Sequence, residues 1–281
     1  MIALKRVFSV VTVLTITGLG TFFSDVRNNL AAHLHGAQGE ETTTTTTIEE
    51  PTTMPYLRPE GIHEAPDGRG KLVALTFDDG PGPISSHVLE SIDNAGGHAT
   101  FFCLGDRAEE YQSILKQIVA QGSEVASHSF SHKRLTRLGN AALADDLSMA
   151  AAALEDFSGT APTLMRPPYG AISDDMVGQI DMPVILWSID SEDWRYCEQL
   201  CQNRSDEQRQ RDFVRVVNSI LDYVQDGDIV LMHDLYCFTQ DVADAVIAEL
   251  HHKGWQFVAV SDLFEMKGIV PQPGVVYHCA R

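Results

Sequence analysis

Two adjacent carboxylates, Asp78 and Asp79, follow the apolar run 72–77 and precede the dipeptide Gly80-Pro81. The run is typical of a short buried strand, and Gly-Pro is a turn signal that ends it. Two neighbouring acids at a strand end repel each other and lose hydration, and a nearby cation relieves that cost. Because successive side chains of an extended segment point in different directions, one Asp can bind a metal while the other exchanges a proton. The same four residues also occur in ordinary surface turns, so the pair alone does not establish a site.

Two histidines, His128 and His132, follow another short apolar run at 123–127. On one turn of helix, residues four apart share a face, and two imidazoles at this spacing commonly form half of a zinc site. Together with an Asp of the first pair they would supply two imidazoles and one carboxylate. Three protein ligands leave a coordination position open, which is the mark of a catalytic rather than a structural metal site. Taken alone, two such histidines are more often ordinary surface residues.

The stretch 166–170 reads Arg-Pro-Pro-Tyr-Gly and follows a predicted strand. Its two prolines restrict the backbone and stiffen the loop. An arginine at a strand end can pair with a nearby carboxylate and lower the pKa of that carboxylate. Arg166 is therefore a candidate site residue, although a surface arginine in a rigid turn would give the same pattern.

Two more strand ends carry groups suited to sugar chemistry. The stretch 190–194 reads Asp-Ser-Glu-Asp-Trp, and the Trp194 indole offers a flat apolar surface for a sugar ring. The stretch 231–234 reads Leu-Met-His-Asp, and His233 can act as a general acid when a carboxylate orients it.

Short apolar runs alternate with amphipathic stretches from Lys71 onward, which predicts a parallel sheet with helices outside it. The predicted strands are 72–77, 99–104, 123–127, 163–166, 184–188, 228–232 and 256–260. The predicted helices are 85–95, 108–121, 140–157, 206–224 and 240–253, with Asn140 as an N-cap and Gly159 as a C-terminal stop. The seven alternations favour a closed or partly closed α/β barrel, in which catalytic residues lie at the C-terminal ends of strands. The five polar groups all fall at such ends.

The five groups together resemble the motifs of the polysaccharide deacetylases, the catalytic domain of carbohydrate esterase family 4, also called the NodB-homology domain. The motifs read T-F-D-D-G at 76–80, H-S-F-S-H at 128–132, R-P-P-Y-G at 166–170, D-S-E-D-W at 190–194 and L-M-H-D at 231–234. All five occur in the order of the family, and the resemblance covers about 71–263. It implies a distorted (β/α)7 barrel, in agreement with the seven predicted strands.

The resemblance implies a divalent metal bound by Asp79, His128 and His132. Zn²⁺ is the expected ion, with Co²⁺ or Mn²⁺ as alternatives. It further implies that Asp78 is the general base and that Arg166 pairs with this base.

The resemblance also assigns the acid and the substrate contacts. His233 corresponds to the general acid and Asp193 to the carboxylate that tunes it. Tyr169 matches the position whose backbone N–H helps bind the oxyanion. Leu231 and Trp194 match positions that line the acetyl pocket and the nearby surface.

The first 23 residues predict a targeting segment, since Lys5 and Arg6 precede the apolar run 7–23. This run fits either an uncleaved signal anchor or a cleaved signal peptide. Residues 24–66, which include a threonine run at 42–47, have the low complexity of a disordered linker. The catalytic domain is expected at 67–281, outside the membrane and near the cell wall.

The charge of the chain argues against two classes of partner. Its 39 Asp and Glu residues outnumber 20 Lys and Arg residues, for a formal net charge of −19. Such a chain is not suited to nucleic acid or to an anionic membrane surface. No protein partner is predicted.

Three of the five cysteines, Cys197, Cys201 and Cys237, follow strand ends on the active face. A disulfide among them is expected in an oxidising compartment. The alternative, a second zinc site, lacks an evident fourth ligand. Cys103 is expected to be buried in a strand, and the state of Cys279 is left open.

These observations predict a secreted or membrane-anchored, metal-dependent N-deacetylase of GlcNAc-containing polymers. Peptidoglycan is the first choice of substrate, chitin or chitooligosaccharide the second, and an O-acetyl ester of xylan the third. A non-catalytic wall-binding protein is the rival from another class. The presence of Asp78, His233 and the three metal-ligand candidates argues against that rival.

Overall fold

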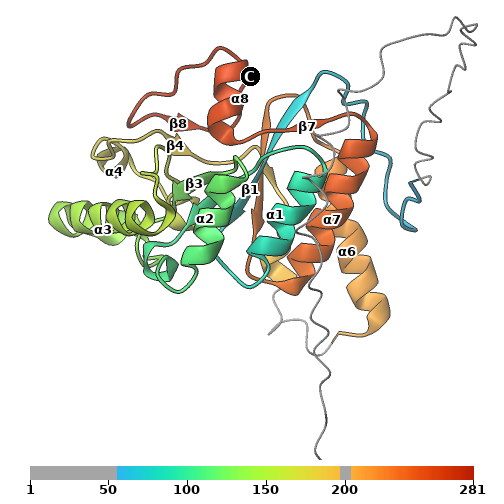
Figure 1. Ribbon diagram of the computed structural model, residues 1–281, viewed down its shortest axis with the longest axis horizontal. Helices are drawn as coiled ribbons and strands as arrows, with labels where there is room; N and C mark the ends of the chain where they lie inside the picture. Colours follow the sequence, from blue (N-terminus) through green and yellow to red (C-terminus); the bar gives the residue numbers. More distant parts are fainter. Residues whose placement is uncertain (1–55, 197–203) are drawn as a thin grey trace, which may run out of the picture. The chain divides into compact units, whose positions relative to one another are not determined.

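Strand β1 (Leu72–Asp78) lies at the centre of a parallel sheet in the computed structural model, which describes residues 56–196 and 204–281 (Figure 1). The other strands are β2 (Thr100–Cys103), β3 (Glu124–Ser127), β4 (Val184–Ile185), β5 (Ile189–Asp190), β6 (Asp228–His233), β7 (Gln256–Phe257) and β8 (Val276–Tyr277). The order in the main sheet is β3-β2-β1-β6-β5, and β7 pairs with the first residues of β1. All of these pairings are parallel.

The segment 184–190 closes the sheet into a distorted barrel. Met165 forms parallel bridges with Ser127 at the end of β3 and with Val184 at the start of β4. Further along the same segment, β5 pairs with β6, which pairs with β1. The ring therefore runs through β1, β2, β3, Met165 and 184–190 and returns through β6. This arrangement confirms the predicted α/β barrel.

Helices cover the outside of the sheet in the order of the strands they follow (Figure 1). They are α1 (Ser85–Asn94), α2 (Gln112–Ala120), α3 (Asn140–Ser158), α4 (Asp174–Val177), α6 (Asp206–Leu221), α7 (Cys237–His252) and α8 (Val260–Met266). Neighbouring contacts run α3-α2-α1-α7-α6, which parallels the strand order β3-β2-β1-β6-β5. None of the helices in the described part of the chain combines the length and hydropathy needed to cross a bilayer.

Strand β1 is buried on both faces and separates two apolar cores. Its odd-numbered side chains at 73–77 pack in the core beneath the helices, whereas Leu72 and Ala74 pack in a second core with residues of α8. Because side chains alternate along a strand, Thr76 and Asp78 continue the face of Leu72 and Ala74. The strand thereby directs Asp78 toward the interior of the barrel at its C-terminal end.

Four strand predictions, at 72–77, 99–104, 123–127 and 228–232, are confirmed to within a residue. The predicted strand at 163–166 is wrong, because only Met165 forms bridges and Pro167 has no N–H to extend a ladder. Of the predicted strand at 184–188, only Val184–Ile185 forms a strand, β4, and the next strand, β5, begins at Ile189. The carbonyls of Ile185 and Leu186 accept hydrogen bonds from the Arg166 guanidinium, which takes these acceptors out of the ladder.

The helix predictions hold less well at their ends than in their middles. Helix α2 begins at Gln112 rather than at 108, after a 3-10 turn at Gly105–Arg107. Gly139 rather than Asn140 is the N-cap of α3, while Gly159 ends that helix with φ 85°, as predicted. The predicted strand at 256–260 stops at Phe257 because α8 begins at Val260.

Residues 56–66, which the sequence placed in the linker, pack against α6 and α7. Ile62 is buried in the core beneath the helices. The guanidinium of Arg58 donates to both carboxylate oxygens of Glu249 on α7, each at 3.0 Å, and the Ala65 N–H donates to the same carboxylate. The predicted targeting segment 1–23 lies outside the described residues, as do Cys197 and Cys201 of the predicted disulfide.

Candidate active site

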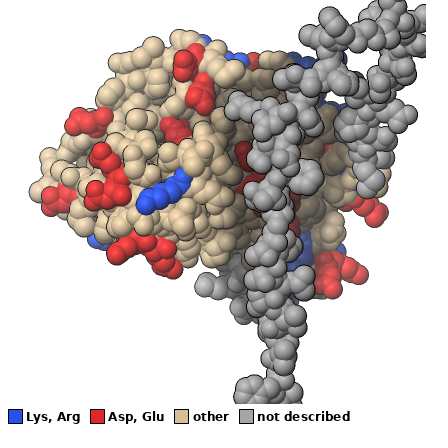
Figure 2. All heavy atoms as spheres, in the orientation of Figure 1, with Lys and Arg blue, Asp and Glu red and all other residues tan. Residues whose placement is uncertain are grey.

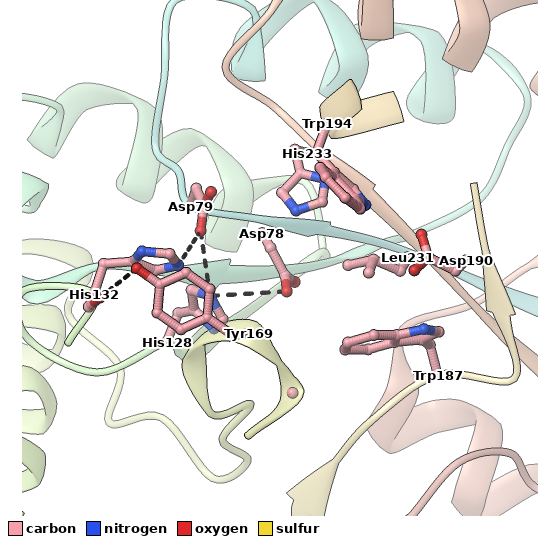
Figure 3. A pocket seen from close by; sticks show the side chains of 11 residues that line it. Asp78, Asp79, His128, His132, Tyr169, Trp187, Asp190, Trp194, Leu231 and His233 are labelled. Carbon is pink, nitrogen blue, oxygen red and sulfur yellow. Dashed lines mark hydrogen bonds and ion pairs between the residues drawn. The ribbon is translucent and has the colours of Figure 1, made fainter. Parts of the chain in front are cut away.

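Three candidate metal ligands converge at the C-terminal ends of β1 and β3 (Figure 3). Asp79 Oδ1 lies 3.2 Å from Nε2 of His128 and 3.0 Å from Nε2 of His132. One ligand atom from each residue lies within 4.8 Å of the others. Burial alone would raise the pKa of Asp79, but the two adjacent imidazoles outweigh burial and hold the pKa well below its ordinary value. The carboxylate is therefore ionised and available to a cation.

The chemistry of this donor set fits a divalent metal. His128 Nδ1 lies 2.8 Å from the carbonyl oxygen of Arg166, so the neutral ring carries its proton on Nδ1 and presents a lone pair at Nε2. That lone pair faces Asp79 Oδ1, a buried oxygen that has no well-aligned hydrogen bond within the described residues. Two electron-rich atoms so close together need a proton or a cation between them. Two imidazoles and one carboxylate are also a known ligand set for catalytic zinc.

The two histidines lie on a loop, so their predicted placement on one turn of helix is wrong. His128 directly follows β3, and the chain reverses through Ser129 and His132, which have φ values of 72° and 55°. The Ser129 hydroxyl accepts a hydrogen bond from the His132 N–H at 3.1 Å. The loop brings the two imidazoles together by its turn geometry instead of by helical periodicity.

Backbone strain is concentrated in the loops that carry these motifs. Among the described residues, every non-glycine residue with positive φ lies in a motif loop: Asp79, Ser129, His132, Tyr169 and Glu192. L-residues avoid this region, and such conformations persist only where the surrounding structure enforces them. For Asp79, φ is 69°, which turns its side chain away from the direction of Asp78 at the end of β1.

Asp78 pairs with Arg166 inside the barrel. Nη1 of Arg166 donates to Asp78 Oδ1 at 2.6 Å and to the Thr76 hydroxyl at 2.8 Å. Arg166 is completely buried, with its guanidinium 4.0 Å from the centroid of the Phe102 ring. Burial lowers the pKa of Arg166, and the Asp78 carboxylate opposes that effect. Oδ1 is thus occupied, while Oδ2 lies on the side of His128, 3.8 Å from its Nε2.

On the opposite wall, Asp193 holds His233. Asp193 Oδ1 lies 2.8 Å from His233 Nδ1, and its Oδ2 accepts hydrogen bonds from the His233 backbone N–H and from the Thr239 hydroxyl. Burial alone would lower the pKa of His233. Attraction and hydrogen bonding from the fully buried Asp193 outweigh burial and raise the pKa to about 9. His233 can therefore carry a proton at neutral pH and present it at Nε2.

The three candidate metal ligands, Asp78 and His233 line one pocket of about 370 Å³ (Figure 3). Tyr169, Trp194 and Leu231, for which the resemblance implies roles in binding the substrate or the oxyanion, lie on its wall. Trp187 and Asp190 also line it and were not assigned a role in advance. Trp187 packs against Gly170, where an added Cβ would lie 2.7 Å from the indole. Nothing in the local sequence around Trp187 distinguishes it from an ordinary core aromatic residue.

Asp234 and Ser85 support the loop of Asp79, and no local sequence pattern predicts their contact. Asp234 is completely buried and accepts a hydrogen bond from the Ser85 hydroxyl, while Ser85 Oγ accepts one from the Gly82 N–H. Burial raises the pKa of Asp234 to about 7. A Cβ at Gly80 would lie 2.3 Å from Asp234 Oδ1, so only glycine fits beside this carboxylate.

Comparison with known proteins identifies deacetylases as relatives of this chain. The sequence profile of the polysaccharide deacetylases matches residues 65–182. Over 205 residues the chain is 38% identical to the peptidoglycan-N-acetylmuramic acid deacetylase PdaC of Bacillus subtilis. This match covers 73% of this chain and 41% of PdaC. Over 208 residues it is 33% identical to the peptidoglycan-N-acetylglucosamine deacetylase PgdA of Listeria monocytogenes. This second match covers 73% of this chain and 42% of PgdA. The chain thus spans about two fifths of the length of these curated relatives.

A solved structure matches this chain over nearly the whole of its own length. The structure of the T48 deacetylase with substrate matches with a TM-score of 0.65 and 32% sequence identity. The match covers 74% of this chain and 96% of that one. Sequence and fold agree, and the chain belongs to the polysaccharide deacetylase family.

Proposed function

We propose that this protein hydrolyses the N-acetyl group of GlcNAc residues in a cell-wall polysaccharide and releases acetate. The observation that carries the proposal is the joint presence, in one pocket, of three kinds of group. These are the three candidate metal ligands, the carboxylate of Asp78 held by Arg166, and the imidazole of His233 held by Asp193. Amide hydrolysis needs an activated water, a proton acceptor and a proton donor, and each of these groups suits one of the three tasks.

The candidate metal site and the Asp78 carboxylate have different roles in activating the attacking water. A divalent ion held by Asp79, His128 and His132, with Zn²⁺ as our first choice, would acidify a water and polarise the amide carbonyl. Asp78 would accept a proton from the attacking water. Its Oδ1 is bound to Arg166, so Oδ2 is the oxygen with capacity for the proton. The hydrogen bond from the Arg166 guanidinium fixes the direction of this carboxylate.

His233 completes the reaction on the other side of the pocket. An amine anion is a poor leaving group, so the nitrogen must gain a proton as the C–N bond breaks. His233 Nε2 donates that proton, because Nδ1 is committed to Asp193. The backbone N–H of Tyr169 donates to the developing oxyanion, and the left-handed backbone at this residue, with φ 64°, sets its direction.

Peptidoglycan is the substrate that we favour. PdaC and PgdA, which share 38% and 33% identity with this chain, are named for the deacetylation of peptidoglycan sugars. The exposed ring of Tyr169 and the half-exposed indole of Trp194 give the pocket apolar surfaces against which a sugar ring can pack. We further propose that residues 1–23 target the chain for export, as a cleaved signal or as an anchor. Residues 24–55 would then be a linker outside the membrane.

Acetate release by the full-length protein, purified in detergent and loaded with Zn²⁺, tests this proposal. The substrates are peptidoglycan, chitin oligomers and acetylated xylan, each with and without a chelator. We expect acetate and an equal amount of new amine from peptidoglycan, loss of both on chelation, and recovery when Zn²⁺ or Co²⁺ is added back. Acetate from xylan alone would identify an esterase. Metal binding without acetate from any substrate would support a wall-binding protein instead.

A further inference from the structure

A cationic side chain lies beside the pocket and has no role in the chemistry proposed above. The loop of His132 continues through the exposed residues Lys133 and Arg134. The guanidinium carbon of Arg134 lies 4.8 Å from the centroid of the Tyr169 ring. The same ring lies 4.6 Å from the imidazole of His132, and its hydroxyl donates to the His132 carbonyl at 3.4 Å. Tyr169 therefore connects the guanidinium to a candidate metal ligand through two successive ring contacts.

The guanidinium of Arg134 is not used by the protein itself. Within residues 56–196 and 204–281, its side chain makes no hydrogen bond and no ion pair, although it stacks on an aromatic face. Other arginines near the pocket are occupied: Arg195 pairs with Glu192 at 2.9 Å, and Arg107 donates to the Pro81 carbonyl at 2.7 Å. Stacking orders a guanidinium and leaves its N–H donors available at its edge.

The pocket beside Arg134 carries several acidic side chains. Asp78, Asp79 and Asp190 line the pocket, the chain has a formal net charge of −19, and acidic side chains are spread over the face seen in Figure 2. Such a surface repels a negatively charged ligand. A free, oriented guanidinium at the pocket edge supplies local attraction, and its planar fork matches the two oxygens of a carboxylate.

We propose that Arg134 determines specificity by binding a carboxylate of the glycan next to the reacting N-acetyl group. This inference rests on the function proposed above and refines its substrate class to acidic amino-sugar glycans. The carboxylate can belong to the sugar itself, as in the ether-linked acid of a muramic acid residue. It can also belong to a peptide stem attached to that residue. Both sources offer the same chemistry to the guanidinium.

The test compares the metal-loaded, full-length wild type with Arg134→Gln, Arg134→Lys and Arg137→Gln. Arg137 is an exposed arginine three residues further along, which also lacks an ion pair in the described chain and contacts no pocket ring. Arg137→Gln therefore makes the same charge change away from the pocket. The substrates are glycan strands with peptide stems, the same strands with stems removed, and neutral chitotetraose. The readout is the ratio of kcat/KM on each acidic glycan to kcat/KM on chitotetraose.

We expect Arg134→Gln to lower this ratio about 10- to 100-fold, the usual contribution of a hydrogen bond to a charged group. The loss should lie mainly in KM and should shrink at high salt. Arg134→Lys should fall between wild type and Arg134→Gln, because it keeps the charge without the fork. Arg137→Gln should keep the wild-type ratio. The carboxyl of a muramic acid residue is free only when its stem is removed, because the stem is attached to it as an amide. A loss confined to stem-bearing strands would therefore assign the carboxylate to the peptide, and a loss confined to stem-free strands would assign it to the sugar. A loss on both would show that Arg134 binds either carboxylate.

An unchanged ratio in Arg134→Gln, or an equal loss in Arg137→Gln, would overturn the proposal. Binding of the acidic strands and of chitotetraose is measured in parallel by calorimetry in the Asp78→Asn background. If the wild type releases no acetate from any glycan, the proposed function fails. The Arg134 proposal is then judged on binding alone: Arg134→Gln must weaken the binding of the acidic strands and leave the binding of chitotetraose unchanged.

Discussion

Asp193 holds His233 by both ring and backbone, with Oδ1 2.8 Å from Nδ1 and Oδ2 2.8 Å from the backbone nitrogen. This double contact fixes the imidazole plane and leaves Nε2 as the ring nitrogen that can reach a substrate. Thr239 donates to the same carboxylate and restrains its rotation. The acid of the proposed reaction is thus positioned by residues of two other segments.

Replacing His233 by alanine removes the proposed proton donor and leaves the candidate metal ligands in place. We expect kcat on an N-acetyl glycan to fall by about 10²- to 10⁴-fold, the usual contribution of general acid catalysis. Metal content, measured on the same sample, should stay at the wild-type level. Wild-type kcat in a metal-loaded His233→Ala enzyme would remove this residue from the mechanism.

The pH dependence of catalysis should report the Asp193–His233 pair. The pKa of His233 is raised to about 9, so the imidazole is protonated below that pH and loses its proton as pH rises through it. A general acid must be protonated, and activity should therefore decline on the alkaline side. Asp193→Asn removes the charge that raises this pKa, so the alkaline limb of kcat/KM should move to lower pH by about one unit or more. An alkaline limb at the same pH in both metal-loaded enzymes would contradict this assignment.

Gly80 should tolerate no side chain. A Cβ at this position would lie 2.3 Å from the buried Asp234 carboxylate, so Gly80→Ala must displace the loop that carries Asp79. We expect the free energy of unfolding to fall by about 1–3 kcal/mol, as for other overpacked sites, and metal affinity to fall with it. Gly139→Ala is the matched control, because nothing lies within 4 Å of a Cβ added there. Urea denaturation and metal titration of both variants provide the measurement, and equal behaviour would show that the contact carries no constraint.

Arg58 should fasten residues 56–66 to the catalytic domain. Its guanidinium binds both oxygens of Glu249, whose side chain is fully buried. Arg58→Gln leaves that carboxylate without its cationic partner, and we expect a loss of about 1–3 kcal/mol in the free energy of unfolding. Glu60→Gln, at an exposed position nearby, should have little effect. Limited proteolysis should cut within 42–53 and leave 56–66 attached; cleavage between Arg58 and Lys71 in the wild type would argue against the contact.

The strands that position the site could be predicted because their information is local. β1, β2, β3 and β6 are short apolar runs bounded by turn signals, and chemistry-bearing residues follow them directly. Alternation along β1 also places Thr76 and Asp78 on the interior face. The five motifs and their order then indicate which side chains meet.

What the sequence did not reveal depends on contacts between distant segments. The strand expected at 163–166 is reduced to bridges at Met165 by the neighbouring prolines. The turn geometry of the His128–His132 loop rests on left-handed residues that local propensity disfavours. The contact of Asp234 with Ser85 joins residues far apart in the chain, and neither carries a local signal of its partner.

Metal occupancy and acetate-release rate of Asp78→Asn, determined on one sample, test the central claim most directly. The claim is that Asp79 holds the metal while its neighbour Asp78, held by Arg166, accepts the proton of water. Asparagine is nearly isosteric and accepts no proton at neutral pH. We therefore predict full metal occupancy with kcat reduced at least about 100-fold, whereas Asp79→Ala loses both metal and activity. A metal-loaded Asp78→Asn enzyme with wild-type kcat, or one that is metal-free while Asp79→Ala stays loaded, would contradict the account.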